Sequence, residues 1–303
     1  MTGEHFLSPM DPWPEIAPFG KKIFLEKSQI CLFYFESGKG NPKHLILIHG
    51  LGDEADTWRH IIHPLGEKYH VIALDLPGFG RSDKPDRVYS PQFFIETIQA
   101  LMDKLSINNT FFIGSSLGGM LAQGFGVEHP DRVLGLILVD GTLLQKEPMS
   151  DMSLRLMRVP LLGEWLYTRL RKNPESAFDS LRSVYHDLDG MPQKDREFLY
   201  QRVNKRVWSN GQRFAYFSTL RNLTKWVRES QDGLAEKLST YNLPTLIVRG
   251  EFDPLFSEIN ADALAQAQAN TDKVVIPDAG HLPHQETPDA FINAISLWLS
   301  DQT

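Results

Sequence analysis

Two adjacent serines, Ser115 and Ser116, lie between an apolar run and a pair of glycines in the stretch FFIGSSLGGM at residues 111–120. A serine hydroxyl becomes an effective nucleophile when a base removes its proton and preset donors receive the charge on the attacked oxygen. The pattern Gly-x-Ser-x-Gly fits with Ser116 at its centre, because centring it on Ser115 puts an isoleucine and a leucine at the glycine positions. The spacing therefore predicts nucleophilic catalysis by Ser116, with a helix N-cap in a glycine-rich turn as the alternative.

The elements that must position this serine are visible as continuous apolar runs rich in β-branched residues. Such runs predict strands buried on both faces, as in a parallel sheet. They lie at residues 44–49, 70–76, 110–114, 133–140, 244–250 and 273–277. Two further short strands are expected near 22–27 and 30–36, joined by a turn. Helical patterns alternate with the runs, one of them opened by Ser90 and Pro91, so the sequence predicts an α/β fold.

With these elements around the serine, the sequence resembles the α/β-hydrolase family over roughly residues 21–141 and 243–299. Besides the serine turn, LILIHGLGD is similar to the family's strand and His-Gly loop, and DLPGFGRSD to its next glycine-rich turn. The resemblance implies a mostly parallel central sheet with helices on both faces. It also implies that the backbone N–H groups of Leu51 and Leu117 form an oxyanion hole, and that His49 is structural.

The resemblance further places an acid and a base after the serine, in the chain order Ser, Asp, His. Asp253 follows one predicted strand in VRGEFDPLF, and His281 follows the next in IPDAGHLPHQETP. His281 would take the proton of Ser116, and Asp253 would hold the imidazole tautomer and stabilise the imidazolium. Ser115 departs from the family, in which many relatives carry His or Asn before the nucleophile. We expect its side chain to touch the substrate.

Each of these roles has a competitor in the sequence. Asp140, at the end of LILVD, is the rival acid, because some members of the family take their acid from that strand. His284 is the rival base, three residues beyond His281. Asp253 could instead be a turn residue before a proline, and Asp278 is interpreted as a loop-cap carboxylate.

Composition excludes several classes of protein. The chain has 303 residues, of which 42% are hydrophobic and 23% charged, as in ordinary globular proteins, and its net charge of -7 argues against nucleic-acid binding. The N-terminus lacks the pattern of a signal peptide, no apolar run suggests a membrane span, and Cys31 alone cannot form an internal disulfide. We therefore expect a cytoplasmic protein without membrane association. No Cys/His cluster has zinc-ligand spacing, and we expect no metal or other cofactor.

Residues 142–242 interrupt the alternation with helix-like segments. They hold 17 Lys and Arg against 12 Asp and Glu, a balance of +5, while the rest of the chain has a balance of -12. In the family, an insert at this position forms a helical cap, so we expect a core at 1–141 and 243–303 and a cap at 142–242. Trp165 is expected to line the substrate pocket. Two interpretations of the basic residues stay open, namely solvated surface charge and cations that bind an acidic or phosphorylated substrate. A third, a basic amphipathic face that rests on an anionic membrane surface, ranks below them.

These inferences favour a serine hydrolase that acts on an ester or lactone of a small to medium, largely apolar molecule, with or without a negative charge. A carbon–carbon bond hydrolase of diketones would use the same three residues. A non-catalytic binding protein on the same fold is the alternative from another class.

Overall fold

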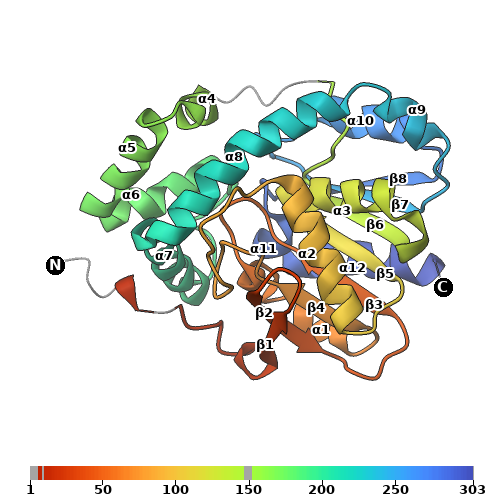
Figure 1. Cartoon of the computed structure of the whole chain (residues 1–303), viewed down its shortest axis with the longest axis horizontal. Coiled ribbons are helices and arrows are strands. Elements are labelled where there is room, and N and C mark those ends of the chain that lie inside the picture. Colours follow the sequence, from red (N-terminus) through yellow and green to blue (C-terminus); the bar gives the residue numbers. More distant parts are fainter. Residues whose placement is uncertain (1–5, 9, 147–151, 303) are drawn as a thin grey trace.

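The computed structural model describes residues 6–8, 10–146 and 152–302, and within them an eight-stranded sheet forms the centre (Figure 1). The strand order is β1-β2-β4-β3-β5-β6-β7-β8. Strands β3 to β8 run parallel, and β2 is antiparallel to both of its neighbours. The strands are β1 (Gly20–Leu25), β2 (Ile30–Ser37), β3 (His44–Ile48), β4 (His70–Leu74), β5 (Thr110–Ser115), β6 (Val133–Val139), β7 (Thr245–Gly250) and β8 (Thr271–Ile276). The predicted α/β-hydrolase sheet is thereby confirmed.

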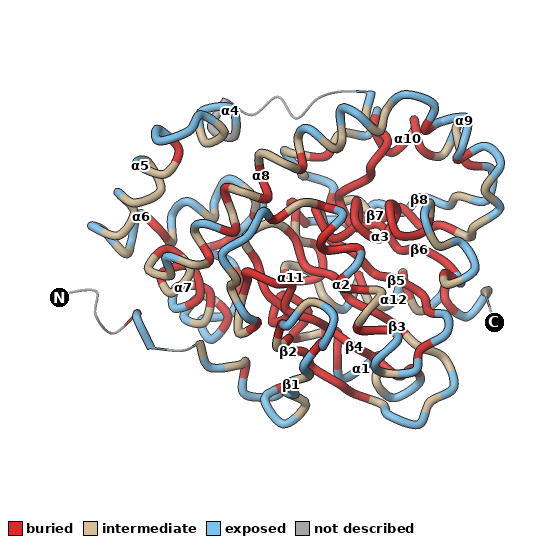
Figure 2. Tube along the Cα trace, viewed as in Figure 1, coloured by how far each residue is buried: buried red, intermediate tan, exposed pale blue. Residues whose placement is uncertain are grey.

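The sheet is buried on both faces because its strands are apolar at successive positions. In β3, Leu45 and Leu47 join the apolar cluster on one face, whereas Ile46 and Ile48 join the cluster on the other. This division follows from the two-residue period of a strand. Figure 2 shows the buried trace concentrated in these central strands and in the helix faces turned toward them.

Helices of the body cover the two faces of the sheet. The body helices are α1 (Ile62–Gly66), α2 (Pro91–Lys104), α3 (Leu117–Glu128), α10 (Glu258–Ala267), α11 (Pro283–Glu286) and α12 (Pro288–Asp301). Helices α2 and α3 contribute to the cluster on one face, and α1 and α12 to the cluster on the other. Helix α2 begins as predicted: Ser90 accepts a hydrogen bond from the Phe93 N–H at 3.2 Å, and Pro91 takes the first helical position.

The insert between β6 and β7 contains helices and no strand in its described part. Its helices are α4 (Met152–Arg158), α5 (Leu162–Arg169), α6 (Pro174–Asp179), α7 (Gln193–Trp208), α8 (Asn210–Ser230) and α9 (Leu234–Ser239). Helices α4 to α8 gather on one side of the molecule, whereas α9 lies beside α10 (Figure 1). Leu234 and Leu238 of α9 belong to the core of the body. The same core contains Ala215 and Leu223 of α8, so the insert packs onto the body through both α8 and α9.

None of the helices in the described part of the chain has both the length and the apolar composition needed to cross a membrane.

Candidate active site

Ser116 lies between β5 and α3 in a backbone conformation that residues other than glycine rarely adopt, with φ 52° and ψ -113°. The turn is so tight that a Cβ atom on Gly114 would come within 2.3 Å of the backbone of Gly118, and one on Gly118 within 2.1 Å of the Ile48 carbonyl oxygen. The two glycines of the pattern are therefore sterically required. The turn leaves Ser116 partly exposed, although the residues on both sides of it are buried.

Ser115 is placed away from any substrate. Its residue is fully buried, its hydroxyl has no hydrogen-bond partner in the described structure, and it does not line the cavity that contains Ser116. The reason is that Ser115 still belongs to β5, in which neighbouring side chains point to opposite faces. The expectation that Ser115 contacts the substrate is not supported by this placement.

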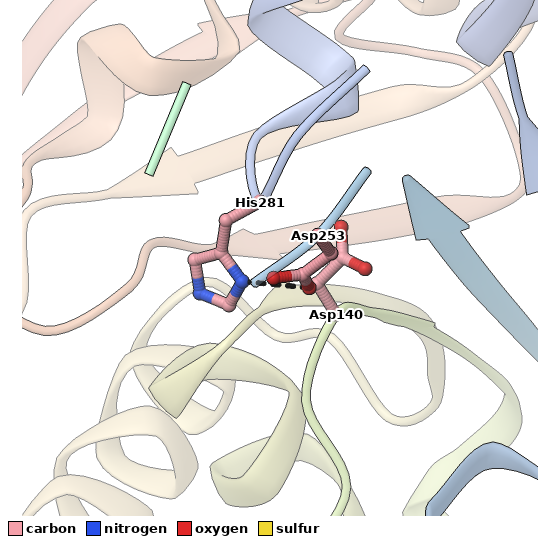
Figure 3. Close-up of side chains that lie close together, drawn as sticks. All are labelled: Asp140, Asp253 and His281. Atoms are coloured by element: carbon pink, nitrogen blue, oxygen red, sulfur yellow. Dashed lines mark hydrogen bonds and ion pairs between the residues drawn. The ribbon is translucent and has the colours of Figure 1, made fainter. Parts of the chain in front are cut away.

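His281 and Asp253 form a hydrogen-bonded pair on the loops that follow β8 and β7. His281 Nδ1 lies 2.9 Å from Asp253 Oδ2 (Figure 3), and Asp253 Oδ1 accepts the Leu255 N–H at 2.7 Å. Both carboxylate oxygens are thus occupied, and the imidazole is held with Nδ1 as the donor. Burial by itself would raise the pKa of Asp253, but His281 and a hydrogen bond from Asp140 outweigh burial and lower it. Asp253 is consequently ionised at neutral pH.

Asp140 lies directly beside this pair, at the end of β6 (Figure 3). It is buried, and its Oδ1 accepts the Gly250 N–H at 3.1 Å. Burial and the neighbouring Asp253 carboxylate raise the pKa of Asp140 well above its usual range. The raised pKa favours the protonated form of Asp140, next to the Asp253 carboxylate that His281 contacts.

Asp140, Asp253 and His281 offer ligand atoms within 4.8 Å of one another, which is a spacing that a metal ion could use. The hydrogen bonds just described already engage His281 Nδ1 and both oxygens of Asp253. The cluster is accounted for as an acid–base arrangement.

The other candidates from the sequence lie elsewhere. His284 is buried in α11, where its Nε2 is 2.9 Å from Thr57 Oγ1 and its ring packs against Trp58 at 4.2 Å. Asp278 is exposed on the loop after β8. Neither residue lines the cavity.

The loop after β3 approaches Ser116 from the other side. A Cβ atom on Gly50 would lie 3.4 Å from the Cβ of Ser116, and the next residue, Leu51, lines the cavity together with Leu117. Leu117 opens α3, so its N–H has no acceptor within the helix. His49 supports this loop: its Nε2 accepts the Leu76 N–H at 3.0 Å, which leaves Nδ1 to donate to the Gly50 carbonyl at 2.7 Å.

A cavity of about 530 Å³ lies between the body and the insert, and Ser116 and His281 open into it. Ser116 and His281 line it from the body, and α7 and α8 line it from the insert. Its apolar wall consists of Leu51, Leu117, Met120, Leu181, Val184, Leu199, Leu220, Leu223, Val227, Leu255 and Leu282. Trp165 is 54% exposed, lies under the guanidinium of Arg169 and does not line the cavity, so its expected role in substrate binding is not supported.

Comparison with known proteins identifies the family. A family model described as the alpha/beta hydrolase fold matches residues 43–288, well over half of the chain. The chain belongs to the α/β-hydrolase family.

This α/β hydrolase is 29% identical over 274 residues to a 2-hydroxy-6-oxo-6-(2'-aminophenyl)hexa-2,4-dienoic acid hydrolase of Metapseudomonas resinovorans, covering 88% of this chain and 87% of the relative. It is 27% identical over 261 residues to an esterase of Mycobacterium tuberculosis, covering 84% and 82%. Its fold is similar to that of a putative lipase from Acinetobacter baumannii, with a TM-score of 0.76, 23% identity and coverage of 93% and 91%. These relatives are named as hydrolases of different kinds, so the likeness identifies the family and not the substrate.

An ion cluster that the sequence analysis did not predict joins the insert of this α/β hydrolase to the loop beside Ser116. Arg202 and Arg206 of α7 form ion pairs with Asp53 and Glu54, and Arg206 Nε donates to Glu54 Oε2 at 2.9 Å. Burial would raise the pKa of Asp53, but the two arginines lower it well below its usual range. Two features of the sequence could have predicted this cluster. One is the Arg-x-x-x-Arg spacing, which puts both arginines on one helix face, and the other is the acidic pair directly after the His-Gly loop.

Replacing Arg202 with methionine is expected to lower the free energy of unfolding by roughly 3–5 kcal/mol, because it leaves buried carboxylates without their partner. Arg202 is fully buried. Lys194→Gln is the matched control, since Lys194 is on the same helix but pairs with Glu15 at the surface, where ion pairs contribute about 0–1 kcal/mol. Urea denaturation of both variants measures the difference. Equal small losses would contradict a buried, structurally required cluster.

His284 is expected to make the protein less stable in acid. Burial lowers the pKa of His284 to about 3, whereas a histidine in an unfolded chain titrates near ~6.5. Between these values the unfolded chain binds a proton that the folded chain does not. The free energy of unfolding therefore falls as pH falls, by up to roughly 1.4 kcal/mol per pH unit. His284→Gln removes this contribution, so urea denaturation between pH 7 and 4.5 should give a shallower dependence for the variant.

The same variant separates His284 from the candidate base. Because His284 does not line the cavity, His284→Gln is expected to leave the pH profile of kcat/KM for a neutral ester unchanged. The informative part of the profile is the decline of kcat/KM at low pH, where the base is protonated. If His284→Gln loses this decline and His281→Gln keeps it, the base is His284.

Proposed function

We propose that this α/β hydrolase is a serine hydrolase that cleaves a carboxylic ester or lactone of a small to medium, largely apolar molecule. The observation that carries the proposal is the arrangement around one cavity: Ser116 on a strained turn, and His281 hydrogen-bonded to Asp253 on the facing loops. The parallel strands support it, because the carboxyl ends of β5, β7 and β8 meet at one edge of the sheet.

In the proposed reaction, Ser116 Oγ forms a bond to the carbonyl carbon while His281 Nε2 takes the hydroxyl proton. The backbone N–H groups of Leu51 and Leu117 donate to the oxygen that becomes negative. Collapse of this intermediate breaks the bond to the alcohol oxygen, which receives the proton from His281, and leaves an acyl group on Ser116. Water then attacks the acyl carbon and gives a proton to His281. The bond from this carbon to Ser116 Oγ breaks, Oγ takes the proton back from His281, and the carboxylic acid is released.

Asp253 assists in two ways in this scheme. It fixes the imidazole in the tautomer whose Nε2 can accept a proton, and its negative charge stabilises the imidazolium. The Leu255 N–H, which donates to Asp253 Oδ1 at 2.7 Å, holds the carboxylate in place. The insert and the body together supply the apolar wall that excludes water from the acyl group, with Leu199 of α7 and Leu220 of α8 on the side of the insert.

A carbon–carbon bond hydrolase is the second candidate, and the relative named as a dienoic acid hydrolase favours it. Purified protein should be assayed with a series of carboxylic esters of increasing acyl length and with a vinylogous diketone. We expect turnover of esters, with an acyl group trapped on Ser116 in the steady state. Cleavage of the diketone without ester turnover would favour the second candidate. Absence of both activities and of labelling by a fluorophosphonate would indicate a binding protein.

A further inference from the structure

The cavity is lined by cations of two kinds. Arg202 and Arg206 are paired with carboxylates in the buried cluster. Lys146, Arg158 and Arg228 also line the cavity, and none of these three side chains has an ion pair or hydrogen bond with any described residue. Among the described lining residues the one carboxylate is Asp53, which is engaged by both paired arginines. The cavity therefore presents positive charge that has no partner among the described residues.

Arg158 is the most confined of the three unpaired cations. It is half-buried at the end of α4, and its Nε is buried without a hydrogen-bond partner in the described structure. Burial and the neighbouring Arg155 lower the pKa of Arg158, and within the described part of the chain no carboxylate pairs with its guanidinium. A buried cationic donor left unpaired is costly, which makes an anionic group in the cavity a stabilising occupant.

The length of helix α8 along the cavity allows an anionic group of the substrate to bind at a distance from the carbonyl that reacts with Ser116. Tyr216, near its beginning, touches the loop beside Ser116: a Cβ atom on Gly52 would lie 3.1 Å from the Tyr216 ring. The same side of α8 continues with Leu220, Leu223 and Val227 along the cavity and ends at Arg228. At 1.5 Å per residue, Arg228 lies about 18 Å farther along the helix than Tyr216. Lys146 and Arg228 are exposed, so they lie where the cavity meets solvent.

We propose that the substrate of this α/β hydrolase is an ester that also carries an anionic oxygen group, joined to the ester by an apolar segment. The unpaired cations of the cavity, Arg158 inside it and Lys146 and Arg228 at its opening, bind that group. The inference rests on the proposed ester hydrolysis and adds the class of substrate. A carboxylate and a phosphate monoester share the required chemistry, since both accept charge-assisted hydrogen bonds from a guanidinium.

The test compares matched esters on the same enzyme. One arm uses p-nitrophenyl monoesters of α,ω-dicarboxylic acids of increasing length, each against the neutral ester of equal chain length. A second arm compares an acyl glycerol phosphate with the corresponding acylglycerol. The quantity measured is the ratio of kcat/KM for the anionic ester to that for the neutral ester, at low and at high salt. We expect a ratio of about 10 or more for one arm at its best chain length, and a smaller ratio at high salt.

Arg158→Gln should lower this ratio about tenfold, and Arg155→Gln is its control. Arg155 is exposed on the same helix and does not line the cavity, so its substitution should leave both basal activity and the ratio unchanged. Neutral-ester turnover by each preparation reports folded enzyme. Arg228→Gln, at an exposed position, tests the opening independently and should also lower the ratio.

The failure of this inference is distinguishable from failure of the proposed function. Neutral esters hydrolysed as fast as anionic ones at every length would overturn the anion site and leave ester hydrolysis intact. An equal drop of the ratio in Arg155→Gln and Arg158→Gln would assign the effect to the general charge of the insert and overturn the assignment to Arg158. Absence of turnover with every ester would overturn the proposed function itself.

Discussion

Replacing Ser116 with alanine is expected to abolish ester turnover, with kcat reduced by about 10⁶, and to abolish labelling by a fluorophosphonate. The expected loss is large because the serine, the histidine and the acid act as a unit, and removing the nucleophile removes the whole covalent pathway. The fold should survive, because the strained conformation at φ 52° is imposed by the surrounding turn, and alanine adds no atom to it. Residual turnover then measures what cavity binding and the oxyanion donors supply without covalent chemistry.

Ser115→Ala is the matched control, one residue away in the same segment. The Ser115 hydroxyl is buried without a partner, and its removal leaves no other group unpaired. The variant should keep most of both activity and labelling. Because the two serines fall in one peptide, the labelled residue must be located by fragment sequencing. A label on Ser115 would show that the nucleophile has been assigned to the wrong serine.

Replacing Asp253 with asparagine is expected to lower kcat by up to about 10⁴, which is the scale seen when a triad carboxylate is neutralised. The carboxylate oxygen 2.9 Å from His281 Nδ1 selects the tautomer with a free Nε2. An amide can present a donor there, which favours the wrong tautomer, and it no longer stabilises the imidazolium. Steady-state kinetics with a neutral ester, with unfolding measured in parallel, would quantify the loss.

Asp140→Asn is the control for the Asp253→Asn experiment, because it makes the same change at the neighbouring carboxyl group. Asp140 accepts the Gly250 N–H through Oδ1, and its raised pKa favours the protonated form beside Asp253. An asparagine side chain can accept the same N–H and, like a protonated carboxyl group, carries no charge. Asp140→Asn should therefore retain most of the wild-type kcat. A greater loss in Asp140→Asn than in Asp253→Asn, with the fold intact, would place the acid at position 140.

Much of this architecture could be predicted from the sequence, because it depends on local pattern. The apolar runs were long, β-branched and separated by helical patterns, so they specified a parallel sheet whatever their order in space. The glycines on both sides of Ser116 identified the turn, because a side chain at either position would collide with the backbone. The Ser90-Pro91 start of α2 is similarly local, since the cap bond closes within the first turn.

The remaining features required the tertiary structure, because they depend on directions and on contacts between distant segments. His281 and His284 are three residues apart, yet one meets Asp253 and the other is buried against Trp58. Asp140 was the rival of Asp253 as the acid, and in the structure His281 contacts Asp253, while burial and the neighbouring carboxylate raise the pKa of Asp140.

Which residues line the cavity also could not be predicted from the sequence alone. Ser115 and Trp165 were expected to contact substrate from their neighbourhood in sequence, but strand alternation turns one into the core and the packing of α5 leaves the other at the surface. The pairing of Arg202 with Asp53 joins residues 149 positions apart. The sequence by itself determined which residue types could do chemistry and which elements carry them. Which of them meet was decided by the fold, because side-chain direction and burial are set by elements that are remote along the chain.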